Sequence, residues 1–167
     1  MSGFGSIAKL CREHLLEEFD CGVDDLNRFL KRQSLGSQQA HSAQTYVVAK
    51  DWRVSGYYSL AAASVTFEAA TDRLKKGQAR HPVPAILLAR LAVDRRMHGK
   101  GLGAALLKDA LLRAAGAADT IGARALLVHA KDDQAKTFYE HFNFESSPSD
   151  PLHLMLLMKD VIRLVSR

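Results

Sequence analysis

The chain has 167 residues, 47% of them hydrophobic and 25% charged, and its formal net charge is +5. This length fits one domain spanning residues 1–167, and the composition is ordinary for a soluble protein with a proper core. No apolar run approaches the roughly 20 residues that a membrane span needs, and the N-terminus lacks the apolar segment of a signal peptide. We therefore expect a cytoplasmic protein that makes no membrane contact.

The first predicted elements are a short strand and a helical region. Residues 6–10 predict the strand. The aspartate pair at 24–25 precedes an apolar repeat of helical spacing over 26–35, and aspartate is a good helix N-cap. Gly36 is expected to end this helix, and a second helical piece is expected over 37–41.

The middle of the chain predicts a hairpin. Residues 45–50 are β-branched and aromatic, as strands often are. A tight turn at 51–53 leads to an antiparallel partner strand over 54–65. Residues 67–77 are expected to hold a short helix. Two prolines then predict an extended loop over 78–84.

The second half alternates strands and helices. An apolar strand over 85–93 is followed by a helix from 101 to about 121, which Gly122 ends. A buried strand is expected over 124–130, and Asp132 should cap a helix that reaches 142. The final strands are expected at 144–145 and 152–159. The pattern predicts an α+β fold, a mixed sheet with helices on both faces.

The chain carries few signs of a disulfide framework or a metal site. Cys11 and Cys21 have neither a C-x-x-C nor a zinc-binding spacing, so reduced thiols are expected. His141 and His153 have no partners at metal-ligand spacing, and the motif H-E-x-x-H is absent from the sequence. We therefore expect no metal.

Charge is unevenly distributed along the chain. Residues 73–100 hold eight Lys/Arg against one acid, whereas the first 30 residues hold six acids against three bases. A local basic field suits a polyanion, although a solvated loop is an equally good reading of the side chains at 73–80. The basic residues that could contact a nucleic acid are Arg73, Lys75, Lys76, Arg80 and Arg90.

The stretch over 88–118 organises the rest of the chain. A strand, a polar turn at 94–100 with glycines at Gly99, Gly101 and Gly103, and an apolar helix follow one another. The first N–H groups of a helix have no intrahelical partners, and the helix dipole adds positive potential. Glycine lets a bulky ligand approach the backbone closely. The stretch therefore predicts a pyrophosphate site.

Spacing narrows the choice of ligand. The P-loop pattern G-x-x-x-x-G-K-[ST] is missing from the sequence, and the glycines read G-x-G-x-G instead of the dinucleotide fingerprint G-x-G-x-x-G. A structural glycine turn is the alternative. The sequence RMHGKG at 96–101 fits [RQ]-x-x-G-x-[GA] and resembles the acetyl-CoA pyrophosphate motif of the GCN5-related N-acetyltransferase (GNAT) family.

A second block supports the same resemblance. KDDQAKTFYEHFNF at 131–144 is similar to the family's segment N-x-x-A-x-x-F-Y-x-x-x-G-F. The matching positions are Ala135, Phe138, Tyr139 and Phe144. Asp132 replaces the usual Asn, and Asn143 replaces the usual Gly, whose backbone conformation Asn tolerates.

The resemblance implies a GNAT fold, with a central mixed but mostly antiparallel sheet of six to seven strands, and acetyl-CoA as cosubstrate. It implies that the strand backbone at 91–93 pairs with the pantetheine as an added strand would. It also implies a set of cofactor-binding residues: Leu91, Ala92, Val93, Arg96, His98, Gly99, Lys100, Gly101, Leu102, Gly103, Ala104, Asp132, Lys136 and Phe138.

Tyr139 stands where the family places its general acid. A phenol with a pKa near 10 suits protonation of a leaving thiolate. The alternative for Tyr139 is a core tyrosine on an amphipathic helix. An α-amine has a pKa near 7.7 to 8.0, so much of it is already neutral and no general base is named.

The N-terminal half narrows the resemblance further. FDCGVDDLNRFL at 19–30, GYYSLAAASV at 56–65 and HPVPAILLARLAVD at 81–94 resemble the acetyltransferase toxins of bacterial toxin–antitoxin pairs. That implies acetylation of the α-amine of the amino acid on charged tRNA, which blocks translation. It also implies a ribbon-helix-helix antitoxin as partner, and a homodimer is expected.

Other readings stay open. A GNAT enzyme acting on a small-molecule amine or a protein amine would use the same cofactor site, although the basic stretch argues against a polyamine. A non-catalytic binding module is disfavoured because the glycine turn and Tyr139 are both retained.

Several further side chains carry expectations of their own. Tyr57, Tyr58 and Ser59 either line the acceptor side or pack in the sheet. His98 is expected to make a loop contact, and His129 to be a satisfied core histidine. Arg90 should face the cleft, because burying an unpaired guanidinium is unfavourable.

Overall fold

The computed structural model describes residues 4–166 and divides the chain into two compact units. The first unit holds the described residues up to Ala61 together with Ala89–Ala110. The second holds Ala62–Leu88 and the described residues from Leu111 onward. One-domain organisation over 1–167 therefore stays a prediction. Among residues 4–166, none of the helices has the length and apolar content needed to cross a membrane.

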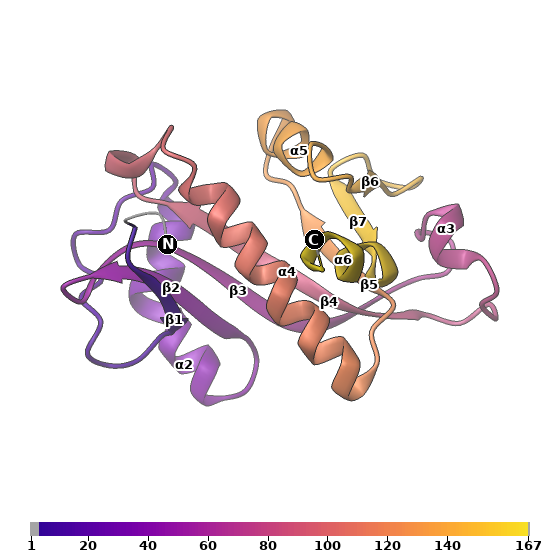
Figure 1. The fold of residues 1–167 in the computed structure, drawn as a ribbon, viewed down its shortest axis with the longest axis horizontal. Helices are drawn as coiled ribbons and strands as arrows, with labels where there is room; N and C mark the ends of the chain where they lie inside the picture. The colour runs from indigo at the N-terminus through magenta and orange to yellow at the C-terminus, as the bar shows by residue number, and fades with distance from the viewer. Residues whose placement is uncertain (1–3, 167) are drawn as a thin grey trace. The chain divides into compact units, whose positions relative to one another are not determined.

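Seven strands form a sheet in the order β1-β2-β3-β4-β5-β7-β6 (Figure 1). Their bounds are β1 (Ser6–Lys9), β2 (Gln44–Lys50), β3 (Arg53–Val65), β4 (Val83–Val93), β5 (Ala125–His129), β6 (Glu145–Ser146) and β7 (His153–Leu157). The pair β4/β5 is parallel, whereas β1/β2, β2/β3, β5/β7 and β6/β7 are antiparallel. The expected mixed, mostly antiparallel sheet of six to seven strands is confirmed.

In the first unit, helices cover both faces of the β2–β3 pair. The helices are α1 (Asp24–Arg28), the π-helical turn η1 (Phe29–Gln33), α2 (Ser34–Gln39) and the first part of α4 (Leu102–Ile121). Tyr57 on β3 stacks with Phe29 of η1 at 6.2 Å between ring centroids. Its neighbour Gly56 faces the opposite side, where a Cβ would lie 2.9 Å from Leu106 of α4. Adjacent strand residues point to opposite faces, so the expectation of helices on both faces is confirmed here.

The helical region from α1 to α2 corrects two expectations. Val23 occupies the N-cap position, and the aspartates at 24–25 lie in the first turn, where negative charge still suits the helix dipole. Gly36 does not end the helix, because one internal glycine costs only about 1 kcal/mol and tertiary packing overrides it. The helix ends at Gln39, and His41 follows with a left-handed φ of 59°.

The second unit contains α3 (Asp72–Lys75), α5 (Asp133–Glu140) and α6 (Met158–Val165). Its core consists of Val65, Ala70, Leu74, Val83, Ala85, Ala125, Leu127 and Met155. Helix α6 was not expected. The final strand was predicted to reach residue 159, but β7 ends at Leu157 and α6 begins at Met158. Met158 and Val161 are three residues apart on one side of α6, and both side chains are buried. Strand β4 begins at Val83, so the loop before it is shorter than expected, and the Pro84 carbonyl accepts a hydrogen bond from Arg124 N at 2.8 Å.

Several local signals are confirmed. Asp51 and Trp52 form a two-residue turn between β2 and β3, with φ of 51° and 69°. Gly122 ends α4 with φ of 78°, and Asn143 follows α5 with φ of 73°. Asp132 caps α5, as expected.

Candidate functional site

The glycine turn, defined as residues 99–104, lies in the first unit and leads into α4. Gly99 and Gly101 have φ of 75° and 84°, which a side chain would strain. A Cβ at either glycine would meet nothing within 4 Å, so the space above the turn is open. The bond from Ala105 N to Gly101 O, at 3.1 Å, begins the helical ladder. The N–H groups of residues 102–104 precede that ladder and suit an anion.

Asp94 caps the short 3-10 turn η2 (Arg95–Met97), which precedes the glycine turn. Its carboxylate is 2% exposed and accepts hydrogen bonds from Arg96 N at 2.9 Å and from Asp20 N at 3.1 Å. The Arg96 side chain adds Nε–Oδ1 at 3.0 Å and Nη2–Oδ2 at 3.1 Å. Burial alone would raise the pKa of Asp94, but the hydrogen bonds from Arg96 and Asp20 lower it to about 2. Asp94 is therefore a carboxylate at neutral pH.

This arrangement changes the role that we assign to the Arg96 side chain. The sequence assigned its guanidinium to the pyrophosphate, yet Nε and Nη2 are occupied by Asp94. The third nitrogen, Nη1, lies 4.0 Å from Glu18 Oε1, and the side chain is 67% exposed. Arg96 thus pairs mainly with Asp94, and its direct contact with a ligand stays a prediction.

Other residues around the glycine turn behave largely as expected. The ring of His98 pairs with Val93 O at 2.8 Å, which is the predicted loop contact. Ala92 is buried in the core of the first unit, whereas Leu91 and Val93 are half-buried. Lys100 is exposed beside the turn.

The second sequence block lies in the second unit, on α5. Asp132 Oδ1 accepts a hydrogen bond from Ala135 N at 2.8 Å, and Oδ2 pairs with Lys131 at 2.9 Å. This capping role explains why Asp can replace the family's Asn. Lys136 and Phe138 are half-buried on the same helix. Whether these side chains contact the cofactor stays a prediction.

Tyr139 is 8% exposed and packs edge-to-face against Phe138 at 5.2 Å and Phe144 at 5.6 Å. Burial raises the pKa of Tyr139 to about 12. Within residues 4–166, its hydroxyl has no hydrogen-bond partner. A phenol with this pKa holds its proton at neutral pH and can donate it to a thiolate.

The side chains proposed for nucleic acid are partly engaged by the protein itself. Arg73 forms an ion pair with Asp160, and Arg80 pairs with Glu68 at 3.1 Å. Lys75 and Arg80 both lie over the Phe67 ring, 5.3 and 5.5 Å from its centroid. These contacts order the loop and compensate part of its charge.

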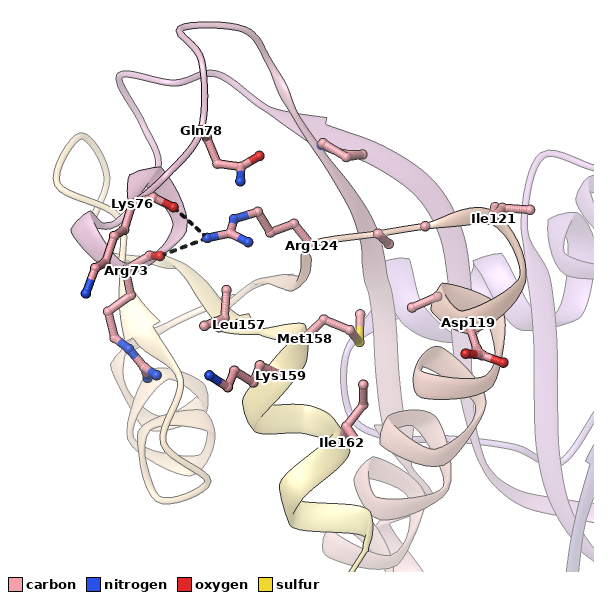
Figure 2. Close-up of a pocket in the computed structure, with 14 residues that line it drawn as sticks. Arg73, Lys76, Gln78, Asp119, Ile121, Arg124, Leu157, Met158, Lys159 and Ile162 are labelled. Carbon is pink, nitrogen blue, oxygen red and sulfur yellow. Dashed lines mark hydrogen bonds between the residues drawn. The ribbon is translucent and has the colours of Figure 1, made fainter.

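Arg73 and Lys76 also line an open groove of about 1180 Å³ in the second unit (Figure 2). Ile121 and Ile162 give this groove exposed apolar side chains. Arg124 reaches from its edge to the end of α3. It donates to Leu74 O at 2.8 Å, to Lys76 O at 3.0 Å and to Arg73 O at 3.4 Å. Sequence reasoning missed this groove because it did not foresee α6.

Arg90 is accommodated by an aromatic ring. Its guanidinium carbon lies 3.7 Å from the centroid of Phe29, a cation–π contact that offsets partial burial. The position of Arg90 on a cleft stays a prediction.

Two other expectations are settled by the structure. Tyr57, Tyr58 and Ser59 are fully buried and pack in the sheet, so an acceptor-side role for them is wrong. Their hydroxyls pair with Leu26 O, Asp109 and Thr45. His129 is exposed rather than in the core, because it is the last residue of β5, and it stacks on His153 at 4.0 Å. In the described part of the chain, no group of three or more metal-ligating side chains is found.

Comparison with known proteins decides the family. A family model described as an acetyltransferase (GNAT) domain matches residues 41–146. A tRNA-acetylating toxin of Mycobacterium tuberculosis is 45% identical over 165 residues, covering 99% of each chain. The chain belongs to the GNAT acetyltransferase family. A probable toxin TacT of Sinorhizobium fredii is 30% identical over 148 residues, 83% of this GNAT chain and 82% of the relative.

Solved structures agree with this assignment. A tyrosine-to-phenylalanine mutant of KacT superposes with a TM-score of 0.89 at 25% identity, covering 95% of this GNAT chain and 98% of that one. AtaT complexed with acetyl-methionyl-tRNAfMet gives 0.88 at 26% identity, with the same coverage. An AtaT tyrosine-to-phenylalanine mutant bound to the C-terminus of the antitoxin AtaR and acetyl-CoA gives 0.82 at 26%, covering 97% and 98%.

Family membership fixes the general chemistry. The protein is an acetyl-CoA-dependent N-acetyltransferase, and acetyl-CoA is its cosubstrate. The open glycine turn fits this ligand, because its backbone donors and positive φ angles suit a pyrophosphate.

Proposed function

We propose that this GNAT enzyme transfers acetyl from acetyl-CoA to the α-amine of the amino acid on charged tRNA, and that it blocks translation as the toxin of a toxin–antitoxin pair. The 45% identity with a tRNA-acetylating toxin over nearly the whole chain carries this proposal. The likeness to AtaT, solved with acetyl-methionyl-tRNA, supports it.

In the proposed complex, the glycine turn holds the cofactor's pyrophosphate. The N–H groups of residues 102–104 supply the donors, and Lys100 adds charge. Because Asp94 neutralises much of Arg96, the backbone contributes more of the attraction than the guanidinium does. The backbone at Leu91–Val93 pairs with the pantetheine amides.

The proposed reaction is direct transfer. The neutral α-amine attacks the thioester carbonyl, the C–S bond breaks, and the coenzyme A sulfur leaves as a thiolate. Tyr139 gives its proton to that sulfur, the new amide nitrogen releases a proton to solvent, and the phenolate recovers a proton from solvent. The raised pKa keeps the phenol protonated at neutral pH, and it also makes the phenol a weaker acid than an ordinary tyrosine.

The proposed partners follow from the relatives. Solved relatives include toxins in complex with the antitoxin AtaR and with DNA. For this chain we propose a ribbon-helix-helix antitoxin, assembly as a homodimer, and action in the cytoplasm, where charged tRNA is found. The cations of residues 73–80 and Arg90 are proposed to contact the tRNA.

A single assay tests the function. Radiolabelled acetyl-CoA is offered with charged tRNA, uncharged tRNA, polyamines and bulk protein side by side. Label in acid-precipitable charged tRNA, and its absence from uncharged tRNA, is the expected result. Label confined to polyamines or protein would overturn the tRNA proposal and favour the other GNAT substrate classes.

A further inference from the structure

The tip of the β2–β3 hairpin carries an unusual residue. Asp51 and Trp52 form a two-residue turn in which both residues have positive φ, 51° and 69°. Turns of this kind favour Asn-Gly or Asp-Gly, because glycine adopts the second left-handed conformation without strain. A bulky side chain there is an outlier, and such strain gathers at functional sites.

Packing does not account for the tryptophan. The residue is 54% exposed, and the neighbouring Leu15 is 56% exposed. The indole makes one tilted ring contact, with His14 at 5.3 Å and 56° between planes. The two rings form an open aromatic corner, with much of the indole facing solvent.

Backbone hydrogen bonds join the two segments that carry these rings. Leu15 N donates to Trp52 O at 2.7 Å, and Val54 N donates to Leu15 O at 3.2 Å. These bonds fasten the hairpin tip to the segment that carries His14. A fixed aromatic surface loses little freedom when a flat ligand stacks on it.

A pocket of about 350 Å³ adjoins this corner. His14, Leu15, Phe19 and Val54 are among its lining residues, and Glu18, Arg53 and Arg96 add charge. Arg53 Nη1 pairs with Glu18 Oε1 at 3.1 Å, so groups of both signs lie side by side there. Carboxylate acceptors and guanidinium donors together match the amino and carbonyl groups at the edge of a nucleobase.

We propose that Trp52, His14 and the adjoining pocket form a nucleobase seat, in which one base stacks on the indole. Aromatic side chains bind unstacked bases in this way in many nucleic-acid-binding proteins. Two substrates carry such a base: the adenine of acetyl-CoA, and an unpaired base of tRNA. The tRNA source rests on the proposed function, whereas the adenine source rests only on the cosubstrate. Arg96 lines the pocket and also lies three residues before Gly99 in the chain, so the seat adjoins the segment that leads into the glycine turn.

The chain offers a direct probe, because Trp52 is its only tryptophan. Coenzyme A, acetyl-pantetheine, which lacks the base, and uncharged tRNA are titrated separately while the intrinsic fluorescence is followed. Quenching by coenzyme A but not by acetyl-pantetheine identifies adenine. Quenching by tRNA identifies an RNA base. Fluorescence unchanged by all three would overturn the seat.

Substitution separates recognition from folding. Trp52→Gly relaxes the turn, so we expect a melting temperature equal to or above that of the wild type. One stacked base corresponds to roughly 5- to 150-fold in affinity, so the KM of the matching substrate should rise by that factor with kcat unchanged. Trp52→Phe should recover part of the affinity. Asp51→Gly relaxes the same turn but keeps the indole, and its KM should not change.

The opposite results are equally clear. A Trp52→Gly variant that is less stable but has wild-type KM values would assign the tryptophan to packing. A fluorescence that changes with protein concentration, together with a lower oligomeric mass for the variant, would make the corner an interface between copies. Wild-type enzyme that fails to acetylate any charged tRNA would defeat the proposed function, while the coenzyme A titration would still decide the seat.

Discussion

Two buried ionisable residues have pKa values shifted in opposite directions. Burial raises the pKa of Tyr139 to about 12, since none of the described residues stabilises its phenolate. Asp94 is also buried, but hydrogen bonds from Arg96 and Asp20 outweigh that effect and bring its pKa to about 2. At neutral pH the phenol therefore keeps a proton to donate, and the carboxylate is a fixed acceptor.

Tyr139→Phe tests the proton donor. The ring and its contacts with Phe138 and Phe144 remain, so the melting temperature and acetyl-CoA affinity should stay close to wild type. Turnover should fall by about 10² to 10⁴-fold, the usual size of general acid catalysis. The same substitution at Tyr46, in β2, serves as the control. Near-normal turnover of the Tyr139 variant would mean that water or another group protonates the sulfur.

Asp94→Asn tests the buried carboxylate that holds Arg96 and Asp20. A carboxylate whose folded pKa is about 2, against an ordinary 3.8, adds stability that is complete above about pH 4. That contribution is lost as the pH falls from 4 to 2, and it corresponds to roughly 2 kcal/mol. Urea unfolding at pH 7, 4 and 2.5 should show the variant destabilised at pH 7 and less sensitive to acid.

The exposed Asp25 provides the matched control, because its ion pair with Arg28 is on the surface. Asp25→Asn should leave the free energy of unfolding nearly unchanged at pH 7. Equal acid sensitivity of the wild type and Asp94→Asn would show that Asp94 is not the group that titrates.

At the scale of the element, the start of α4 combines open space with a left-handed backbone. Gly101→Glu places a carboxylate where the pyrophosphate is proposed, at a φ of 84°. Calorimetry should show acetyl-CoA affinity lost, because repulsion and steric block act together. Gly116→Glu, an exposed position on the same helix, should bind acetyl-CoA normally. Unchanged affinity of the Gly101 variant would remove the turn from the cofactor site.

The basic loop around α3 is the second element with a prediction. Replacing Arg73, Lys75, Lys76 and Arg80 together with Ala should weaken tRNA binding and flatten its dependence on salt. Because Arg73 and Arg80 are already paired with acids, the two lysines should account for most of the change. Filter binding at about 50 to 200 mM salt measures how steeply the tRNA affinity falls as salt is added. A full slope in the quadruple variant would leave the loop as solvated surface.

Predictions from the sequence were most accurate where one residue type determines the local backbone conformation. Gly122 and Asn143 adopt the left-handed conformations expected at helix ends, and Asp132 caps its helix. They were least accurate where packing between distant segments determines the secondary structure or the burial of a side chain. The apolar run at 152–159 does not distinguish strand from helix, and the chain turns into α6 at Met158. His129 is exposed although the rest of its strand is buried on both faces, because it is the last residue of β5.

For the candidate site, the sequence motifs identified the residues but not the side chains with which they form hydrogen bonds. The pattern at 96–101 identified the glycine turn, yet nothing in it indicated that Asp94 would occupy two nitrogens of Arg96. The bond between Arg124 and the end of α3 spans about fifty positions of sequence, and such contacts follow from tertiary structure alone.

At the scale of the whole molecule, the prediction concerns cells rather than binding. Wild-type protein expressed without its antitoxin should arrest growth, and the Tyr139→Phe protein, at equal soluble level, should not. Colony counts after induction, with immunoblots for protein amount, measure the difference. Arrest by a variant shown to lack acetylation would mean that toxicity comes from binding rather than catalysis.

The contact of Arg124 with α3 has a consequence for how the loop can be altered. Its three acceptors are main-chain carbonyls, which every amino acid carries. The path of the loop is thus anchored independently of the side chains displayed on it. The side chains at 73, 75 and 76 can change in charge and size while the loop keeps its course, whereas Leu74 is fixed by its place in the core of the second unit. Exchanging those three side chains is therefore a route to altered substrate preference.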